Sequence, residues 1–303
     1  MLLSEIVKGV ELVEPISTDI EIKNIEFDSR KVGVGSMFVA TRGTAVDGHD
    51  FIVKAIEAGA VAVVCEDMPA EKQAGVVYIN VKDSAEALGR MASNFYGRPS
   101  EQLTLVGVTG TNGKTTIATL LYQLHRALGY KVGLLSTVCN YVDDKAIEST
   151  HTTPDALALN ALLAEMVEAG CQYAFMEVSS HSVDQRRIAG LKFAGGIFTN
   201  LTRDHIDYHK TFDNYLKAKK RFFDELPKGA FAIVNVDDKN GMVMLQNTRA
   251  DKKTYSVRSL ADFTARILEA SFDGMLLNVC NREVFMPFVG RFNAANLSAV
   301  FGA

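Results

Sequence analysis

The sequence predicts an α/β protein, in which a small mixed α/β domain precedes a doubly wound, mostly parallel sheet domain. Three observations predict this class. From about residue 103, strand-like apolar runs alternate with segments of helical spacing. These runs are apolar throughout, as in parallel sheets that helices cover on both faces. Beyond residue 250, two alternating runs flank an Asp-Gly turn, which predicts a small antiparallel addition near the end.

The first segment mixes short β-rich runs with helical patches. Its strands are expected at 20–27, 36–41, 60–65 and 76–81, and its helices at 51–58 and 85–96. The stretch "YGRPS" (96–100) then interrupts the pattern with Gly and Pro, as is typical of a boundary. We therefore expect two domains, 1–96 and 97–303, a division that a chain of 303 residues readily allows.

The second segment repeats a strand–turn–helix pattern. Its strands are expected at 103–108, 131–137, 173–178, 195–200 and 230–235, and its helices at 114–128, 154–169 and 213–223. The Asp-Gly turn lies within a hairpin predicted over 265–279. The stretch "GRFNAANLSAVFGA" (290–303) opens a further helix.

The composition is that of an ordinary globular protein, with 48% hydrophobic and 22% charged residues. A net charge of −4 gives no electrostatic reason to expect nucleic acid or an acidic membrane surface as a partner. The four cysteines form no C-x-x-C pair, and no apolar stretch is long enough for a membrane-spanning helix. We expect a cytoplasmic, monomeric protein with reduced thiols and with neither nucleic-acid nor membrane partners.

The stretch "LTLVGVTGTNGKTT" (103–116) places two glycines between a buried strand and a helix, the context of a phosphate-binding loop. Backbone N–H groups at such glycines can turn toward anionic oxygens, and the helix N-terminus adds partial positive charge. Lys114 can reach the terminal phosphates of a nucleotide, and Thr115 offers a hydroxyl to Mg²⁺. Val108 stands where the strict G-x-x-x-x-G-K-S/T pattern has its first glycine. The residues expected to bind the nucleotide are Gly110, Thr111, Asn112, Gly113, Lys114, Thr115 and Thr116.

Acidic residues and histidines follow two further strands of the predicted sheet. Glu177 lies near the end of "YAFMEV", and His205, Asp207 and His209 lie in "TNLTRDHIDYH". Ligands collect at the carboxyl ends of strands in open α/β sheets, and carboxylates suit Mg²⁺. Zinc stays an alternative, although no cysteine or H-E-x-x-H spacing supports it. Simple solvation of Asp207 and His209 is also open.

The loop "GTNGKTT", with its glycines three apart, resembles that of the ATP-dependent Mur ligases and their folylpolyglutamate synthetase relatives. The resemblance covers essentially the whole chain. Its other stretches are "FDSRKV", "RGTAVDGHDFI", "HTTPD", "EVSSHSVDQRRI", "NLTRDHIDYH" and "GRFNAANL". Related ligases share only the Asn and the Asp-His core of "NLTRDHIDYH". Its Asp-Tyr-His continuation favours the MurE type, which adds the third residue of the peptidoglycan stem peptide.

The resemblance implies a site with two Mg²⁺ ions. Thr115 and Glu177 would hold one ion, and His205 and Lys219 the other. In this family a lysine in Y-x-x-A-K is carboxylated by CO₂, and "YLKAK", which ends at Lys219, matches that pattern. A carbamate supplies an anionic oxygen ligand, whereas an ammonium repels the metal. By themselves, the lysines of "NYLKAKKRFF" indicate only a solvated basic helix face. The implied catalytic residues are Lys114, Glu177, His205 and Lys219.

The resemblance also implies which residues contact the substrates. The second asparagine of "GRFNAANL", Asn296, would face the adenine of ATP. A uridine diphosphate would be surrounded by Phe27, Ser29 and the backbone of Thr44, Ala45 and Val46. The sugar-peptide would contact His151, Thr152, Thr153, Ser179, Gln185 and Arg187. Relatives often have Asn at the position of His151. The fork of Arg187 suits a carboxylate or a diphosphate.

The implied reaction is ATP-dependent amide formation on UDP-N-acetylmuramoyl-L-alanyl-D-glutamate. The γ-phosphoryl group would move to the D-glutamate carboxylate, and the amine of a diamino acid would then displace phosphate. meso-Diaminopimelate, the commoner choice across the family, is favoured, and L-lysine stays open. The family's third domain, which holds this amino acid, has no matching segment in the sequence. We therefore expect the 303-residue chain by itself to be inactive.

Two other classes of function are open. One is another ATP-dependent amide ligase, of the folylpolyglutamate or cyanophycin synthetase kind, against which the "FDSRKV" segment argues. The other is a non-catalytic module that binds ATP only as a switch. Such a module would not need Glu177, His205 and Lys219 together.

Overall fold

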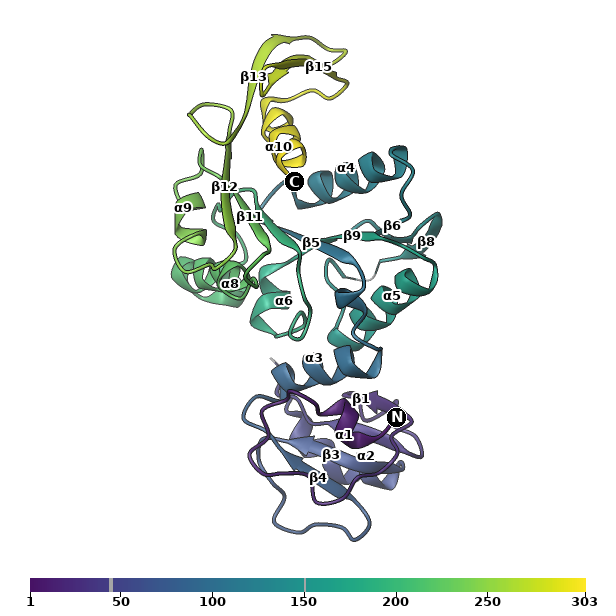
Figure 1. The fold of residues 1–303 in the computed structure, drawn as a ribbon. Coiled ribbons are helices and arrows are strands. Elements are labelled where there is room, and N and C mark those ends of the chain that lie inside the picture. The colour runs from purple at the N-terminus through teal and green to yellow at the C-terminus, as the bar shows by residue number, and fades with distance from the viewer. Residues whose placement is uncertain (44–45, 150) are drawn as a thin grey trace. The chain divides into compact units, whose positions relative to one another are not determined.

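A computed structural model of the chain describes residues 1–43, 46–149 and 151–303. The chain forms two compact units (Figure 1). The first unit consists of Met1–Pro99, Pro154–Ala164 and Gln185–Leu191. The second consists of Ser100–Thr153, Glu165–Asp184 and Lys192–Ala303. Among the described residues, no helix is both long enough and apolar enough to cross a membrane. The predicted α/β class is confirmed.

The first unit contains a four-stranded parallel sheet of order β1-β2-β3-β4. Its strands are β1 (Asn24–Glu26), β2 (Ser36–Val39), β3 (Ala60–Cys65) and β4 (Val77–Asn80). Its helices are α1 (Leu3–Ile6), η1 (Gly48–Phe51), α2 (Ile52–Glu57) and α3 (Ser84–Phe95), joined by the first residues of α5 (Ala156–Glu168). Each strand lies inside a run that the sequence predicted. The edge strand β1 is the most shortened.

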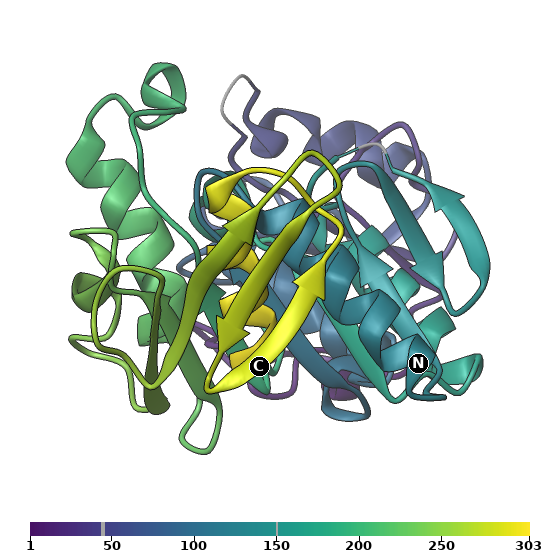
Figure 2. The same cartoon turned by 90° about the horizontal axis from the view of Figure 1, so that it is seen from above.

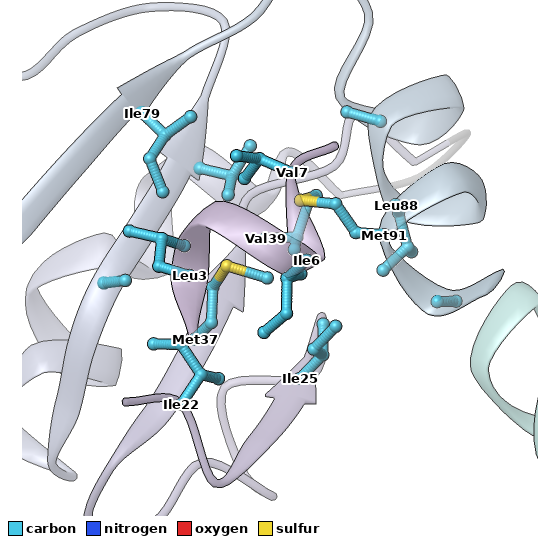
Figure 3. Packing of buried hydrophobic residues seen from close by; sticks show 14 of the residues in the cluster. Leu3, Ile6, Val7, Ile22, Ile25, Met37, Val39, Ile79, Leu88 and Met91 are labelled. Atoms are coloured by element: carbon cyan, nitrogen blue, oxygen red, sulfur yellow. The ribbon is translucent and has the colours of Figure 1, made fainter. Parts of the chain in front are cut away.

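The core of the first unit follows from the two-residue period of its strands. Met37 and Val39 of β2 pack with Leu3 and Ile6 of α1 on one face of the sheet (Figure 3). Phe38, between them in sequence, belongs to a separate cluster on the other face. Full burial of each such side chain contributes about 1.5–3 kcal/mol. Both faces are therefore apolar, as a parallel sheet requires.

The second unit contains an eleven-stranded sheet of order β15-β14-β13-β12-β11-β10-β5-β9-β6-β7-β8. Its strands are β5 (Thr104–Thr109), β6 (Val132–Leu135), β7 (Cys139–Val142), β8 (Lys145–Glu148), β9 (Tyr173–Glu177), β10 (Gly195–Phe198), β11 (Phe231–Asn235), β12 (Asp251–Ser256), β13 (Phe263–Ala270), β14 (Met275–Val279) and β15 (Arg282–Met286). Its helices are η2 (Pro99–Glu101), α4 (Lys114–Ala127), α6 (Ser180–Asp184), α7 (Ile206–His209), α8 (Phe212–Asp224), α9 (Gly241–Met244) and α10 (Arg291–Gly302), with the end of α5. The strands from β6 to β13 in this order pair in parallel.

Helices cover both faces of the central strands of this sheet (Figure 1). Val106 and Val108 of β5 face the cluster that α4 and α10 complete. Gly107 lies between them in sequence, and a side chain there would meet Phe222 of α8 on the opposite face. Gly196 of β10 is in the same situation, so these two glycines let α8 approach the sheet closely.

Antiparallel strands extend the sheet at both ends. The predicted hairpin over 265–279 is confirmed as β13 and β14, with β15 added. Figure 2 shows these three strands together, and β13 packs against α10. The β7–β8 hairpin at the other end was not predicted, because its strands are short and β8 is mostly exposed. The polar strand β12 and the short helices α6, α7 and α9 were also missed.

The order of the central strands positions the site. Strand β5 lies between β9 and β10, which are later in the chain. Because the three strands are parallel, their carboxyl ends lie at one edge of the sheet. The chain segments after Thr109, Glu177 and Phe198 therefore start close together. Such a reversal of strand order is where open α/β sheets bind ligands.

Candidate functional site

The predicted phosphate loop connects β5 to α4, and its conformation requires glycine twice. Gly110 has φ 148° and Gly113 has φ 89°, values that other residues rarely adopt. A Cβ atom at Gly110 would collide with Thr199 Oγ1, and one at Gly113 would lie 2.7 Å from Asn296 Oδ1. Neighbouring side chains thus pack directly against the loop backbone.

Two lysines from different helices converge on this loop. Lys114 Nζ donates to Gly110 O (3.0 Å) and Thr111 O (2.9 Å). Lys219 Nζ, from α8, donates to the same Gly110 O at 2.9 Å, and Lys219 is only 1% exposed. Burial lowers the pKa of Lys114, and it lowers the pKa of Lys219 far more, with repulsion from Lys114 adding to the effect on Lys219. The carbonyl oxygen of Gly110 therefore accepts hydrogen bonds from two lysine side chains.

A buried carboxylate lies beside the start of α4. Glu177, at the end of β9, is 1% exposed. Its Oε1 accepts hydrogen bonds from Thr115 Oγ1 (2.8 Å) and Thr137 N (2.8 Å), and its Oε2 lies 3.2 Å from Thr137 Oγ1. The Thr115 hydroxyl and the Glu177 carboxylate are thus adjacent oxygen donors of the kind that Mg²⁺ prefers.

Tyr215 connects the phosphate loop to the predicted residues Lys219 and His205. Its hydroxyl lies 3.1 Å from Thr111 Oγ1. Lys219 Nζ lies 4.9 Å from the centre of the Tyr215 ring, and the His205 ring centre lies 6.1 Å from it. His205 has φ 52° and precedes α7. In the described ranges, no group of three or more His, Cys, Asp or Glu side chains is arranged to hold a metal ion.

Three predicted substrate residues lie beside Glu177. Thr153 Oγ1 donates to Glu177 O (2.9 Å), and Ser179 N donates to Thr153 Oγ1 (3.3 Å). Thr152 Oγ1 lies 3.1 Å from Thr137 Oγ1. The neighbouring His151 is exposed, and its carbonyl accepts a hydrogen bond from Ser149. Hydroxyl groups suited to a polar substrate therefore lie beside the strand end that carries Glu177.

A large cavity borders the phosphate loop. Its volume is about 1060 Å³. The residues lining it are Asn112, Gly113, Thr199, Asn200, Thr202, Asn235, Asp237, Asp238, Tyr255, Val257, Arg258, Arg266, Ile267, Leu268, Ala270, Arg291, Phe292, Ala295 and Asn296. Asn296, the predicted adenine residue, is therefore in this cavity, and its Nδ2 donates to Asn293 Oδ1 (3.1 Å). Among the lining residues, Lys114, Thr115, Glu177 and Lys219 are absent.

The predicted residues for the uridine nucleotide, with Gln185 and Arg187, belong to the first unit. Phe27 packs against its core, and Ser29 is buried. Val46 is exposed, and its carbonyl accepts from Gly43 N. Arg187 Nε donates to Gln185 Oε1 at 3.0 Å. Thr44 and Ala45 lie outside the described residues.

Two residues that contact the site were given no role from the sequence. Thr137 donates to Glu177 as described above, and Asn200 contacts the phosphate loop. A signal existed for both, because each is the last residue of a run that was predicted as a strand. Neither residue type is distinctive by itself, so only the folded contacts identify them.

Two family models match the chain. The one described as "Mur ligase middle domain" matches residues 108–303, and the one described as "Mur ligase family, catalytic domain" matches residues 21–96. The chain belongs to the Mur ligase family. The predicted resemblance to this family is confirmed.

Relatives within the Mur ligase family are similar along the whole chain. A protein of Parabacteroides distasonis is 63% identical over 304 residues, and one of Bacteroides thetaiotaomicron is 60% identical over the same length. Both are named UDP-N-acetylmuramoyl-L-alanyl-D-glutamate--2,6-diaminopimelate ligase. The match covers 100% of this chain and 63% of each relative. The chain therefore spans less than two thirds of the length of these Mur ligases.

Solved Mur ligase structures share this fold. A structure titled with the same ligase name matches with a TM-score of 0.80 at 28% identity, over 99% of this chain and 62% of that one. A MurF ligase from Thermotoga maritima in complex with ADP matches with a TM-score of 0.59 at 18% identity, over 92% of this chain and 62% of that one. At that identity the second match supports the fold alone.

Proposed function

We propose that this Mur ligase chain takes part in ATP-dependent amide formation, in which a diamino acid is joined to UDP-N-acetylmuramoyl-L-alanyl-D-glutamate. The names of the relatives at 60–63% identity support this substrate pair, with 2,6-diaminopimelate favoured over lysine. One observation carries the proposal. Lys114 and Lys219 converge on Gly110 O, directly beside the Thr115–Glu177 pair. A loop that only binds ATP would not need the second buried lysine.

In the second unit, the phosphate loop from Gly110 to Thr116 would bind the phosphates of ATP. Backbone N–H groups and the start of α4 favour anionic oxygens there, and Lys114 Nζ would move from the loop carbonyls to the terminal phosphates. Asn296 and the cavity of about 1060 Å³ would hold the adenine and ribose. We assign residues 97–303 to this role and residues 1–96 to uridine-nucleotide binding.

The oxygen atoms of the site that could act as metal ligands fit one divalent cation, and a second only after a change at Lys219. Thr115 and Glu177, with oxygens 2.8 Å apart, would hold one Mg²⁺. His205 and Lys219 would hold a second ion only if Lys219 carried a carbamate, since an ammonium there repels cations. When bound, Mg²⁺ supplies positive charge that offsets the charge developing on the transferred phosphoryl group.

The surroundings of Lys219 favour formation of that carbamate. Burial lowers the pKa of its amine, so the neutral form, which has a free lone pair, is more populated than in an exposed lysine. The lone pair attacks the carbon of CO₂ to form an N–C bond, and the nitrogen then loses a proton to solvent. The product is an anionic carbamate. In ¹³C-bicarbonate, the chain should give a carbamate signal that Lys219→Ala lacks.

The reaction itself would proceed in two steps. An oxygen of the D-glutamate carboxylate attacks the γ-phosphorus of ATP, ADP leaves, and an acyl phosphate forms. The amine of the diamino acid then attacks the acyl carbon, phosphate leaves, and the nitrogen loses a proton. Thr152, Thr153 and Ser179 would orient the acceptor beside Glu177, and Lys114 would offset phosphate charge.

The first unit would bind the uridine nucleotide. Phe27 and Ser29 lie close in sequence, Phe27 is partly buried and Ser29 is 9% exposed, which suits an aromatic contact and a hydroxyl contact to a base. Val46, with Thr44 and Ala45, would provide backbone contacts. Arg187, which Gln185 orients, would bind an anionic group of the sugar-peptide. His151 would provide a further contact to the sugar-peptide.

Equilibrium binding to the 303-residue chain tests the proposal without requiring turnover. Titration calorimetry should give saturable binding of ATP with Mg²⁺ and of UDP-N-acetylmuramoyl-L-alanyl-D-glutamate. Lys114→Met should abolish the first and preserve the second. Binding of ATP without any binding of the uridine substrate would favour the switch module. Binding of a folate or another acceptor in its place would favour a different amide ligase.

A further inference from the structure

Asn200, the second residue after strand β10, binds the backbone at the tip of the phosphate loop. Asn112 N donates to Asn200 Oδ1 (3.0 Å), and Asn200 Nδ2 donates to Asn112 O (3.1 Å). One side-chain amide therefore pairs with both the N–H and the C=O of one loop residue. The side-chain amide of Asn200 thus makes the same two kinds of hydrogen bond to Asn112 that the backbone of a paired strand would make.

Further hydrogen bonds from the same segment support this pairing. Thr111 N donates to Asn200 O (2.8 Å), and Thr199 Oγ1 donates to Asn112 O (2.6 Å). Thr202 N donates to Thr111 Oγ1 (3.0 Å). Residues 199–202 thus form a bracket, which we call the β10 bracket, along one side of the phosphate loop.

The loop needs such a bracket because apolar packing does not fix its tip. Asn112 is exposed, and it lies between Gly110 and Gly113, the residues with the greatest backbone freedom. A phosphate-binding loop works only when its N–H groups point at the ligand before the ligand arrives, since ordering the loop on binding weakens affinity. Hydrogen bonds from the rigid end of a central strand meet that need.

We infer that Asn200 is a positioning residue for nucleotide phosphates: it fixes the Asn112 backbone, whose own N–H points at Asn200, so that the following N–H groups, at Gly113 and at the start of α4, face the phosphates. This role rests on the proposed function, since it presumes that the loop binds ATP. Asn112 and Asn200 both line the cavity of about 1060 Å³, so the pair lies where that cavity meets the phosphate loop. The effect of Asn200 on phosphate binding passes through the loop backbone.

The inference is tested by comparing ATP, ADP and adenosine binding to the 303-residue chain. Asn200→Leu keeps the approximate shape of the side chain and removes both hydrogen bonds to Asn112. ATP and ADP affinity should fall about tenfold, the order expected for two hydrogen bonds, while adenosine affinity stays unchanged. A merely structural role would lower the affinity for all three ligands in parallel.

Asn278→Leu is the matched control. Asn278 Oδ1 accepts from Asn281 N (3.0 Å) in the β14–β15 turn, so it also binds backbone through a side-chain amide, and it belongs to neither the phosphate loop nor the β10 bracket. The Asn278→Leu variant should have the same ratio of ATP affinity to adenosine affinity as the unsubstituted chain. Asn200→Asp, which has nearly the shape of Asn, serves as a second variant should Asn200→Leu fold poorly. It cannot donate to Asn112 O and should also lose ATP affinity selectively.

Two results would overturn the positioning role alone. They are unchanged ATP affinity in both Asn200 variants, or an equal loss of ATP and adenosine affinity, in each case with normal ATP binding by the unsubstituted chain. Failure of the unsubstituted chain to bind ATP would instead overturn the proposed function, and the positioning role with it.

Discussion

The two units both contain parallel sheets, but they differ in where they keep their charges. Among the residues that the structure describes, the buried polar side chains of the first unit are uncharged, such as Ser36, Ser84 and Asn94. The second unit buries Glu177 and Lys219 at the ends of its central strands and on the helix beside them. The first unit keeps its ion pairs near the surface.

This difference shows that the second unit contains buried charged groups that lower its folding stability and that the first unit does not. Burying an ion costs several kcal/mol in effect, even after relaxation. A unit that only needs to fold has no reason to accept that cost, and the first unit does not. Buried amines with a lowered pKa are enriched at functional sites, so the buried Lys219 amine at the phosphate loop supports a site at this edge of the large sheet. Four predictions test this comparison, from the largest expected effect to the smallest.

The largest effect is expected for Gly110→Ala. The substitution puts a methyl group against Thr199 Oγ1 at φ 148°, so the loop must move. Overpacking and backbone strain together should cost about 3–4 kcal/mol of unfolding free energy. ATP binding should be lost as well. Urea unfolding and titration calorimetry measure the two effects.

Gly129→Ala is the control for Gly110→Ala. Gly129 also has positive φ (92°) and lies in the second unit, but a Cβ atom there would meet nothing within 4 Å. It should cost about 1 kcal/mol of strain and leave ATP affinity intact. Equal costs at the two positions would show that the packing of Thr199 against the loop is unimportant.

The second prediction compares a buried carboxylate with a half-buried one. Glu177→Leu leaves the hydroxyls of Thr115 and Thr137 and the Thr137 N–H without their acceptor, and should cost about 2–3 kcal/mol. Glu66 of the first unit likewise accepts from Ser84 N (2.9 Å) and Ser84 Oγ (2.8 Å), but its side chain is 18% exposed.

Glu66→Leu should therefore cost only about 1 kcal/mol, because water can replace the lost acceptor. Chemical denaturation of both variants gives the comparison. In addition, only Glu177→Leu should abolish the Mg²⁺ dependence of ATP affinity. A larger cost at Glu66 than at Glu177 would contradict the contrast between the units.

The sequence predicted the elements whose signal is local. Continuous apolar runs identified β3, β5, β9 and β10, since strands buried on both faces leave no polar alternation to confuse them. The β7–β8 hairpin lacked that signal. Its strands are short and lie at the edge of the sheet, so exposed residues interrupt the pattern.

For the site, the sequence predicted residues that sit in distinctive motifs or at strand ends, such as Lys114 and Glu177. It could not predict that Asn200 pairs with Asn112, because that contact joins segments 88 residues apart. The helical spacing of its apolar neighbours in the sequence partly indicates that Lys219 is buried. Tyr215, Phe222 and Phe223 lie four before, three after and four after it, so all share one helix face. Lys217 lies off that face and is exposed.

The third prediction concerns the cost of that burial. In CO₂-free and metal-free buffer at pH 7, Lys219→Met should stabilise the chain by about 1–2 kcal/mol, because an apolar side chain replaces a desolvated amine. The folded pKa of Lys219 is lowered, so between that value and the ordinary one the unfolded chain binds more protons. Stability of the unsubstituted chain therefore rises with pH across this window.

The advantage of Lys219→Met should accordingly shrink when urea unfolding is repeated near pH 10. Lys217→Met is the matched control on the same helix. Its side chain is 69% exposed, so its substitution should change stability little at either pH. A Lys219→Met variant less stable than the unsubstituted chain at pH 7 would mean that the amine is a net stabiliser.

The smallest effect is expected in the first unit, where the charges pair in water. The Arg30 guanidinium, 81% exposed, donates to the Asp28 carboxylate and lowers its pKa to about 2. Because the folded pKa is depressed, the pair stabilises the unit above the ordinary carboxyl range, and that contribution is lost as pH falls toward 2.

Solvent screens so exposed a pair, so Arg30→Gln should hardly change stability at pH 7. It should instead raise the Asp28 pKa toward 3.8, its ordinary value, in a carboxyl NMR titration. An unchanged Asp28 titration in Arg30→Gln would show that the backbone N–H of residue 30, which also donates to Asp28, is sufficient. The surface charges of this unit would then be dispensable, which would widen its contrast with the buried charges at Glu177 and Lys219.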